Sequence, residues 1–472
     1  MAQSRKVDDL DLALMAALTL AAFVFHSWIL TGFGLMPGVD GPYYLIQVRS
    51  ILSGEGMVYG DPPLLFYLSA LASRVLGDLR LGVLFTVSAF CGLSAAPIYA
   101  LLKKLTESRM AGSVAAISLA LSPQIVRMAG DLMKNASGVA FLTFGLYFLH
   151  SSISGDRFSW FNVSMAAISA YLAFLTHSLD FAFLLLFCIA YVVLSSLALR
   201  SNGKAAAIRV GAVLVAVTIT TLATAQAAPD YFTDVDKGVA FIRDLLSPHE
   251  PAPPRPGLKP KPARSWPSPD FMDLGYILPF AAILALLAVD SWRNRDGEAW
   301  GRSGEAVLST ASLAAAAVAI TPQVLKLMEW AWRFALMGCV PVSIAVGLMV
   351  SRLRREKLAA AAVAVALITP GLLQVPSAVR MISPKIGPVE YEDLAAMSQF
   401  VPHNSSIVVA CKLNPYWVEY MLGARVEMRP HNSEPRSEPD LLLWCPGEGP
   451  PPPPDAREIF RGKRLVLMML RP

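Results

Sequence analysis

The sequence predicts a mainly helical, polytopic membrane bundle that ends in a small α/β module. Of the 472 residues, 55% are hydrophobic and only 16% are charged, whereas a soluble domain has about a quarter of its residues charged. About eleven apolar stretches are long enough to cross a bilayer as helices, which takes roughly 20 residues. Residues 381–472 instead alternate helical and strand patterns, which is typical of a compact α/β fold.

The predicted spans follow one another through the first four fifths of the chain. They fall near residues 11–33, 81–102, 110–127, 136–153, 160–176, 180–199, 207–227, 274–290, 305–321, 331–350 and 358–377. Basic side chains occupy every second loop: Arg5/Lys6, Lys103/Lys104/Arg109, Arg157, Arg200/Lys204/Arg209, Arg293/Arg295/Arg302 and Arg352/Arg354/Arg355/Lys357. Basic loops face the cytoplasm, and one missed span would break this alternation. We therefore expect the N-terminus inside and the tail outside.

This topology also predicts the domain division and the general class of partner. The net charge of +5 is modest, and cytoplasmic loops account for it without a nucleic-acid partner. We expect residues 1–380 to form the transmembrane domain of an integral, multi-pass protein of the cell membrane, in contact with membrane lipid. Its external loops are 34–80, with juxtamembrane helices, and the Pro-rich 228–272. Residues 381–472 are expected to form a small extracytoplasmic α/β tail.

The tail carries a clear succession of patterns. The run YEDLAAMSQFV indicates a helix, SSIVVACKL a strand and PYWVEYML a second helix, and the apolar runs DLLLWC and KRLVLMML follow. Cys411 and Cys445 lie in this region and could form a disulfide if the tail is extracytoplasmic. The sequence leaves open whether they do.

Asp40 follows the first predicted span, in the run PGVDGPYYLIQVRSILSGEG. A carboxylate at a membrane exit can act as a general base, or as a metal ligand beside a lipid phosphate. The tyrosine-rich run after it suits a helix that lies in the headgroup layer. Gly-Val-Asp-Gly-Pro is also good chemistry for a solvated turn, and residue type alone favours the turn.

Four polar residues crowd a short predicted external turn between residues 123 and 135: Arg127, Asp131, Lys134 and Asn135. Arg127 and Lys134 can bind phosphate oxygens, and Asp131 can serve as a second carboxylate near Asp40. Ordinary helix-end polarity explains the same residues equally well, with Asp131 as a cap and Lys134 reaching the interface.

Arg333 lies about one turn inside the predicted span that opens with EWAWRF. A charge at that depth is costly and needs a partner or a polar cavity. Guanidinium groups bind phosphate in a bidentate way, so an anionic lipid phosphate suits this position. Pairing with Glu329 one turn earlier is the simpler alternative. We favour the lipid phosphate, because Trp330 and Trp332 already anchor the interface.

His177 and Asp180 share a predicted tight external turn in LTHSLDFAF. The two could form a His–carboxylate dyad, although a hairpin turn between spans needs polar residues in any case, and the sequence favours that reading. No P-loop, GxGxxG, HExxH or CxxC pattern occurs in the sequence. The chain therefore lacks the signatures of nucleotide-binding folds and structural zinc sites.

Taken in order, these segments resemble the GT-C superfamily of integral membrane glycosyltransferases, which use polyprenyl- or dolichyl-phosphate-linked sugars. The resemblance covers about residues 10–150 and the span around Arg333, and it includes both the oligosaccharyltransferase and the dolichyl-phosphate-sugar-dependent mannosyltransferase types. It implies that Asp40 occupies the catalytic position and that Pro62-Pro63-Leu64 matches a segment many members carry. The run WRFALMGCVP resembles the late span whose arginine contacts the donor phosphate. SPHEPAPP resembles a loop that nominates Glu250 as a second acidic residue besides Asp131.

The resemblance implies an inverting transferase that moves a sugar from a polyprenyl- or dolichyl-phosphate donor to an acceptor on the extracytoplasmic face. Asp40 would deprotonate the acceptor hydroxyl, or hold a divalent metal such as Mg or Mn. Arg333, with Lys134 or Arg127, would stabilise the departing phosphate. The Trp-Trp-Asp motif of oligosaccharyltransferases does not occur in the sequence, which favours a monosaccharide transferase. The alternative is a non-catalytic protein on the same scaffold that binds or transports a lipid-linked glycan.

Overall fold

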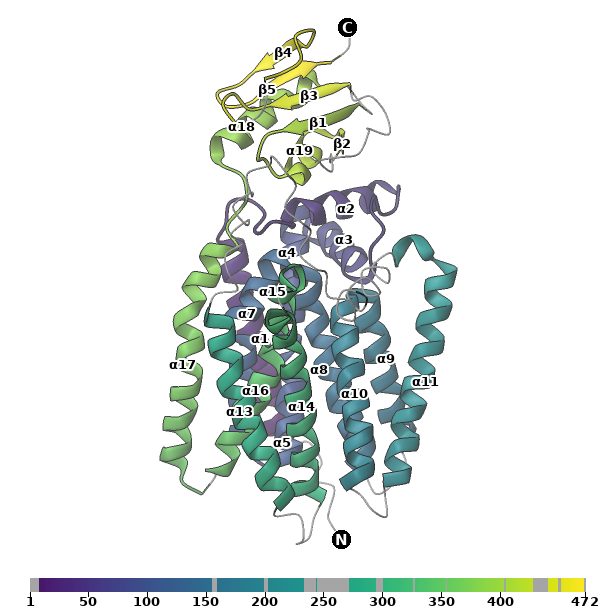
Figure 1. Ribbon diagram of the computed structural model, residues 1–472, viewed down its shortest axis with the longest axis vertical. Helices are drawn as coiled ribbons and strands as arrows, with labels where there is room; N and C mark the ends of the chain where they lie inside the picture. Colours follow the sequence, from purple (N-terminus) through teal and green to yellow (C-terminus); the bar gives the residue numbers. More distant parts are fainter. Residues whose placement is uncertain are drawn as a thin grey trace, which may run out of the picture. The chain divides into compact units, whose positions relative to one another are not determined.

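The computed structural model describes residues 8–154, 159–198, 203–232, 243, 271–293, 300–325, 327–353, 355–402, 405–427, 440–448 and 451–470. Long helices make up most of this part of the chain, and five short strands come near its C-terminal end (Figure 1). The helices before the tail are α1 (Asp9–Thr31), α2 (Gly41–Ser53), α3 (Leu64–Leu76), α4 (Leu79–Leu93), α5 (Ala95–Thr106), α6 (Arg109–Ala120), α7 (Pro123–Asp131), α8 (Met133–Ser154), α9 (Trp160–Thr176), α10 (Ser178–Ala198), α11 (Gly203–Ala227), α13 (Phe271–Arg293), α14 (Trp300–Val324), α15 (Met328–Met337), α16 (Cys339–Arg352) and α17 (Lys357–Met381).

The helices confirm the predicted polytopic membrane fold. Among the described residues, eight helices are long and apolar enough to cross a membrane, or nine if α6 and α7 count as one bent span. Each of the eleven predicted spans contains a helix. Two of these helices are not among the nine candidate spans: α9, which has only 17 residues, and α13.

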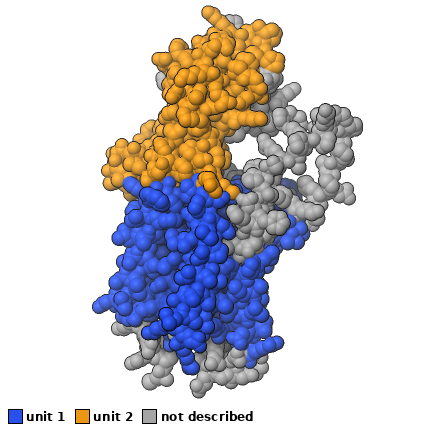
Figure 2. All heavy atoms as spheres, turned by 90° about the vertical axis from the view of Figure 1, so that its left-hand side faces the viewer, with its two compact units in different colours: residues 1–29, 59–65, 85–379 blue, residues 30–58, 66–84, 380–472 orange. Residues whose placement is uncertain are grey.

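The chain divides into two compact units (Figure 2). Unit 1 consists of Met1–Ile29, Tyr59–Leu65 and Phe85–Val379, and unit 2 of Leu30–Val58, Phe66–Leu84 and Arg380–Pro472. Unit 2 therefore combines the tail with two stretches of the predicted first external loop. The run that contains Asp40 belongs to the same unit as the tail.

The predicted turn between residues 123 and 135 is wrong, because most of this stretch is the helix α7. The chain bends by 41° between α6 and α7. Ser122 caps α7 by accepting a hydrogen bond from the Ile125 N–H at 3.2 Å, and Pro123 takes the first helical position. Both are strong helix-start signals. The polar residues of this stretch consequently lie on two packed helices, α7 and α8.

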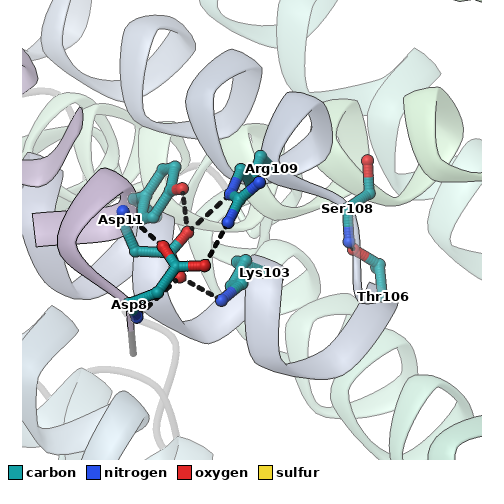
Figure 3. A network of polar contacts seen from close by, with 7 residues as sticks. Asp8, Asp11, Lys103, Thr106, Ser108 and Arg109 are labelled. Atoms are coloured by element: carbon teal, nitrogen blue, oxygen red, sulfur yellow. Dashed lines mark hydrogen bonds and ion pairs between the residues drawn. The ribbon is translucent and has the colours of Figure 1, made fainter. Parts of the chain in front are cut away.

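A network of polar contacts around Asp11 joins α1 to α5 and α6 within unit 1 (Figure 3). Asp11 is 1% exposed, and its carboxylate accepts hydrogen bonds from Tyr99 Oη at 2.8 Å, from Arg109 Nε at 3.0 Å and from Lys103 Nζ. Asp8 accepts the Asp11 N–H at 2.9 Å and forms an ion pair with Arg109. The start of α1 and the connection between α5 and α6 thus lie at the same end of unit 1.

The tail confirms the predicted α/β class. Its five-stranded sheet has the order β2-β1-β3-β5-β4, with β1 parallel to β2 and β3, and β5 antiparallel to β3 and β4. The elements are α18 (Pro388–Met397), β1 (Ser406–Ala410), α19 (Pro415–Leu422), β2 (Arg425–Glu427), β3 (Leu441–Trp444), β4 (Arg457–Arg461) and β5 (Val466–Met469). One face of the sheet is a small apolar core formed by Val408, Leu442, Val466 and Met468.

Cys411 and Cys445 come directly after the paired strands β1 and β3. Both are free thiols in this structure. The Cys445 thiol makes a hydrogen bond to Cys411, and this bond lowers the pKa of Cys411 below its usual value. The same interaction raises the pKa of Cys445. The two residues are therefore neighbours, as a disulfide would require, but are joined here by a hydrogen bond.

Candidate functional site

The main polar cluster of unit 1 lies where α7 packs against α8 and α15. Each helix supplies one basic side chain: Arg127 on α7, Lys134 on α8 and Arg333 on α15. The Arg127 Nε lies 3.8 Å from the Asp131 Oδ2, one turn further along α7, and both side chains are largely buried. The cluster is therefore built from three helices and carries basic groups on each.

Trp332 links two of these basic groups. The guanidinium carbons of Arg127 and Arg333 each lie 5.5 Å from the centre of its indole ring. A guanidinium within about 6 Å of an aromatic face is attracted by the ring quadrupole. One ring therefore helps to hold two like charges near each other, which otherwise repel in a buried setting.

Asp61 is a member of this cluster that the sequence did not single out as a site residue. Its side chain is 7% exposed and forms an ion pair with Lys134, whose side chain is 13% exposed. Burying a carboxylate is costly unless a cation or hydrogen bonds compensate it. The available signal was its position, directly before Pro62-Pro63 at the start of α3.

Several donors of the cluster make no hydrogen bond within the described residues. These buried donors are the Nε of Arg127, the Nε of Arg333, the Nδ2 of Asn135 and the Nε2 of Gln124. An unmet buried donor costs about 1–3 kcal/mol. The same cluster contains three basic side chains, Arg127, Lys134 and Arg333. The arrangement suits an anion with several acceptor oxygens, and a phosphate is such a group.

His177 and Asp180 lie at the predicted tight turn, where α9 is followed by α10. The turn is a single residue between α9 and α10, and Asp180 is fully buried in the first turn of α10. A Cβ atom at Gly138 would come within 2.4 Å of the Asp180 Oδ2, so α8 can approach only because this residue is glycine. Phe183, one turn further on, contacts Phe334, the neighbour of Arg333.

The geometry of this pair does not form a hydrogen-bonded dyad. The His177 Nδ1 lies 3.2 Å from the Asp180 Oδ2, but Nδ1 accepts a hydrogen bond from the Leu179 N–H at 3.2 Å. A ring nitrogen that accepts a hydrogen bond carries no proton to donate. Within the described residues, neither Asp180 oxygen makes a hydrogen bond. The pair is thus a buried polar contact rather than a base oriented by a carboxylate.

Asp40 belongs to unit 2, where it occupies the N-cap position of α2. Pro42 lies in the first turn of that helix and Gly54 ends it in the left-handed conformation. Asp40 is half-buried. A helix N-terminus stabilises negative charge, so the start of α2 favours the ionised form of the Asp40 side chain.

The predicted metal ion involves residues that the structure describes only in part. Glu250 lies outside the described residues. Among those that are described, no three His, Cys, Asp or Glu side chains come together in a way that could hold a metal ion. Asp61 and Asp131 instead face the basic side chains Lys134 and Arg127. The Mg or Mn ion stays a prediction from the sequence.

The fold and the cluster together define a multi-pass membrane protein with a buried, basic polar site. Residues 60–223 match the family model described as dolichyl-phosphate-mannose-protein mannosyltransferase. This match confirms the predicted resemblance to the GT-C glycosyltransferases over about a third of the chain, and it supports a lipid-linked donor. It includes Asp61, Arg127, Asp131 and Lys134, but neither Asp40 nor Arg333.

The solved structures that resemble this chain include two states of one protein, ArnT from Cupriavidus metallidurans. The crystal structure in the apo state has a TM-score of 0.49 and 14% sequence identity, and the one bound to undecaprenyl phosphate has a TM-score of 0.47 and 13% identity. Both alignments cover 97% of each chain. No curated protein matches the sequence.

Proposed function

We propose that this protein is an inverting glycosyltransferase that moves a sugar from a polyprenyl- or dolichyl-phosphate donor to an acceptor on the extracytoplasmic face. The observation that carries the proposal is the polar cluster of unit 1, in which Arg127 and Arg333 both contact Trp332 and Lys134 forms an ion pair with Asp61. It offers buried donors that make no hydrogen bond among the described residues of a membrane bundle. The family match over residues 60–223 supports the same class of donor.

In the proposed reaction, an acceptor hydroxyl attacks the anomeric carbon of the sugar from the face opposite the lipid phosphate. The new bond joins the acceptor oxygen to that carbon, and the bond from the carbon to the phosphate oxygen breaks. The electron pair of the broken bond stays on the phosphate oxygen. Asp40 takes the proton of the attacking hydroxyl, which is general base catalysis. Attack from the opposite face inverts the configuration.

The basic cluster has two roles in this proposal. It binds the lipid phosphate of the donor, and it stabilises the negative charge that develops on the phosphate as the sugar leaves. Arginine is well suited to both roles because its planar group presents paired donors to phosphate oxygens. The ring of Trp332 keeps the guanidinium groups of Arg127 and Arg333 in place.

The decisive experiment replaces Asp40 by asparagine in the full-length protein. Asp40→Asn keeps the size of the side chain and its place before α2, but removes the base. We expect transfer of a labelled mannose from polyprenyl-phosphate-mannose to fall by about a hundredfold or more. Binding of the donor, measured by thermal stabilisation, should stay within about twofold of the native value.

The same assay separates the enzyme from the alternative function. A non-catalytic glycan-binding or transport protein would be stabilised by donor lipid without any turnover. Turnover by the native chain together with an inactive Asp40→Asn variant supports the proposed transferase. Undiminished turnover by that variant would remove Asp40 from the mechanism.

A further inference from the structure

Two main-chain groups just before Asp40 are hydrogen-bonded by residues from the far end of the sequence. The Gly38 N–H donates to the Ile382 carbonyl at 2.7 Å, and the Val39 carbonyl accepts from the Asn414 Nδ2 at 2.6 Å. All four residues belong to unit 2. Gly38 has φ +78°, a conformation that glycine adopts without strain. The backbone that leads into Asp40 is thus bound at two successive residues.

Asn414 is suited to this contact because both ends of its amide are engaged. Its Oδ1 accepts the Tyr416 N–H at 2.9 Å and so caps α19, in which Pro415 is the first residue. Its Nδ2 then points to Val39. An amide supplies an acceptor and a donor from one side chain. The cap therefore fixes the direction of the donor.

The helix that Asn414 caps also contacts α2, the helix that starts directly after Asp40. The rings of Tyr43 and Tyr416 lie 5.3 Å apart, centre to centre. Further along α2, the Arg49 Nη1 donates to the Tyr420 carbonyl at 2.9 Å, and its guanidinium lies 4.8 Å from the Tyr420 ring. α19 consequently contacts the polypeptide on both sides of Asp40.

We infer that α19 and its cap Asn414 position the carboxylate of Asp40, so that the tail is part of the catalytic apparatus. This inference rests on the proposed role of Asp40 as the base. A base works only when its oxygen is held close to the proton it removes, and small displacements cost much of the rate. Asn414 is a positioning residue, since it acts on the reaction through Val39 and Asp40.

The test is Asn414→Asp in the full-length protein. Aspartate is itself a preferred N-cap residue, so α19 keeps its cap. The ionised side chain has no donor for the Val39 carbonyl. We expect kcat for sugar transfer to fall by about tenfold, while KM for polyprenyl-phosphate-mannose stays within about twofold. A purely structural role would instead lower the unfolding temperature and leave kcat of the folded protein unchanged.

Lys412→Gln is the matched control. It also makes the charge more negative by one, at an exposed residue two positions away, and its kcat should equal the native value. If Asn414→Asp lowers the unfolding temperature, a second variant, Arg49→Met, tests the inference. It removes the contacts of Arg49 with Tyr420, which connect α2 to α19 at a distance from the cap. A fall in its kcat with unchanged KM supports the inference, and a native kcat overturns it.

Two results would contradict the inference in distinguishable ways. Native kcat in Asn414→Asp, with Asp40→Asn inactive, overturns the positioning role and leaves the proposed function intact. Full activity in Asp40→Asn overturns both, since there is then no base to position.

Discussion

Unit 1 contains two clusters of charged side chains that differ in how well their donors are satisfied. Around Asp11, two carboxylates meet two basic groups, and Tyr99, Lys103 and Arg109 all donate to the buried carboxylate (Figure 3). Around Trp332, buried nitrogens of Arg127 and Arg333 make no hydrogen bond among the described residues.

This difference separates a structural network from a binding site. Buried polar groups in folded proteins are almost always hydrogen-bonded, and exceptions call for an explanation such as a ligand. The buried carboxylate of Asp11 is hydrogen-bonded within the protein, so this network stabilises the packing of α1 against α5 and α6. The Trp332 cluster has buried donors that make no hydrogen bond among the described residues, and such donors can bind an anion.

The largest effect is expected from Asp11→Asn. The change preserves shape but leaves two cations beside a neutral amide, which is costly at a site where Asp11 is 1% exposed. Since Lys103 and Arg109 reach water in part, we expect a loss of about 2 kcal/mol in the free energy of unfolding. Denaturation in detergent measures it. The affinity for polyprenyl phosphate should be unchanged. A loss of about 2 kcal/mol in the free energy of binding as well would contradict the distinction between a structural network and a binding site.

The sequence analysis did not predict the Asp11 network, and it predicted the basic residues of the Trp332 cluster but not their contacts. Hydrophobic run lengths and basic loops were sufficient for the helical spans, because both follow from the bilayer itself. The start of α7 was also encoded, in Ser122 and Pro123, but the polar residues around it suggested a turn. Asp180 was assigned to a tight turn between spans, and its complete burial was not predicted, because that burial depends on Gly138 of another helix. Asp61 joined the cluster through Lys134, a contact between residues far apart in sequence.

In the tail, too, only some of the elements could be recognised from the sequence. The apolar runs of β1, β3 and β5 were visible in the sequence because these strands form the centre of the sheet. β2 and β4 are the edge strands, and their runs RVE and REIFR are largely polar. Edge strands commonly carry charge, which prevents unwanted pairing. Their polar composition concealed them.

The second prediction concerns the basic cluster itself. Arg333→Gln removes one of the groups proposed to bind phosphate, and we expect affinity for polyprenyl phosphate to fall about tenfold, or about 1.4 kcal/mol. The unfolding temperature should be unchanged or slightly higher, because two like charges no longer share one ring. Arg355→Gln is the control, since Arg355 is exposed. Equal affinities in the two variants would show that the cluster does not bind the lipid phosphate.

A smaller effect is expected from the ring that both guanidinium groups contact. Trp332→Leu keeps an apolar side chain but removes the ring face, and cation–π contacts are worth about 0.5–2 kcal/mol, depending on how far they are shielded from water. Affinity for polyprenyl phosphate should fall about threefold, and Trp332→Phe should recover part of it. The measurement is the same lipid titration. A native affinity in Trp332→Leu would mean that the ring does not hold the arginines in their binding positions.

The smallest effect is expected at the exposed edge of the Asp11 network. Asp8 and Arg109 form an ion pair in which the side chains are 52% and 42% exposed, and exposed pairs contribute little. Asp8→Asn retains an oxygen that can accept the Asp11 N–H, so the unfolding temperature should fall by about 1 °C or less. A loss as large as that of Asp11→Asn would show that the network depends on its surface charges. The surface ion pair, and not the buried carboxylate of Asp11, would then be the main source of stability. Complete hydrogen bonding of buried groups would in that case not distinguish this cluster from the one around Trp332.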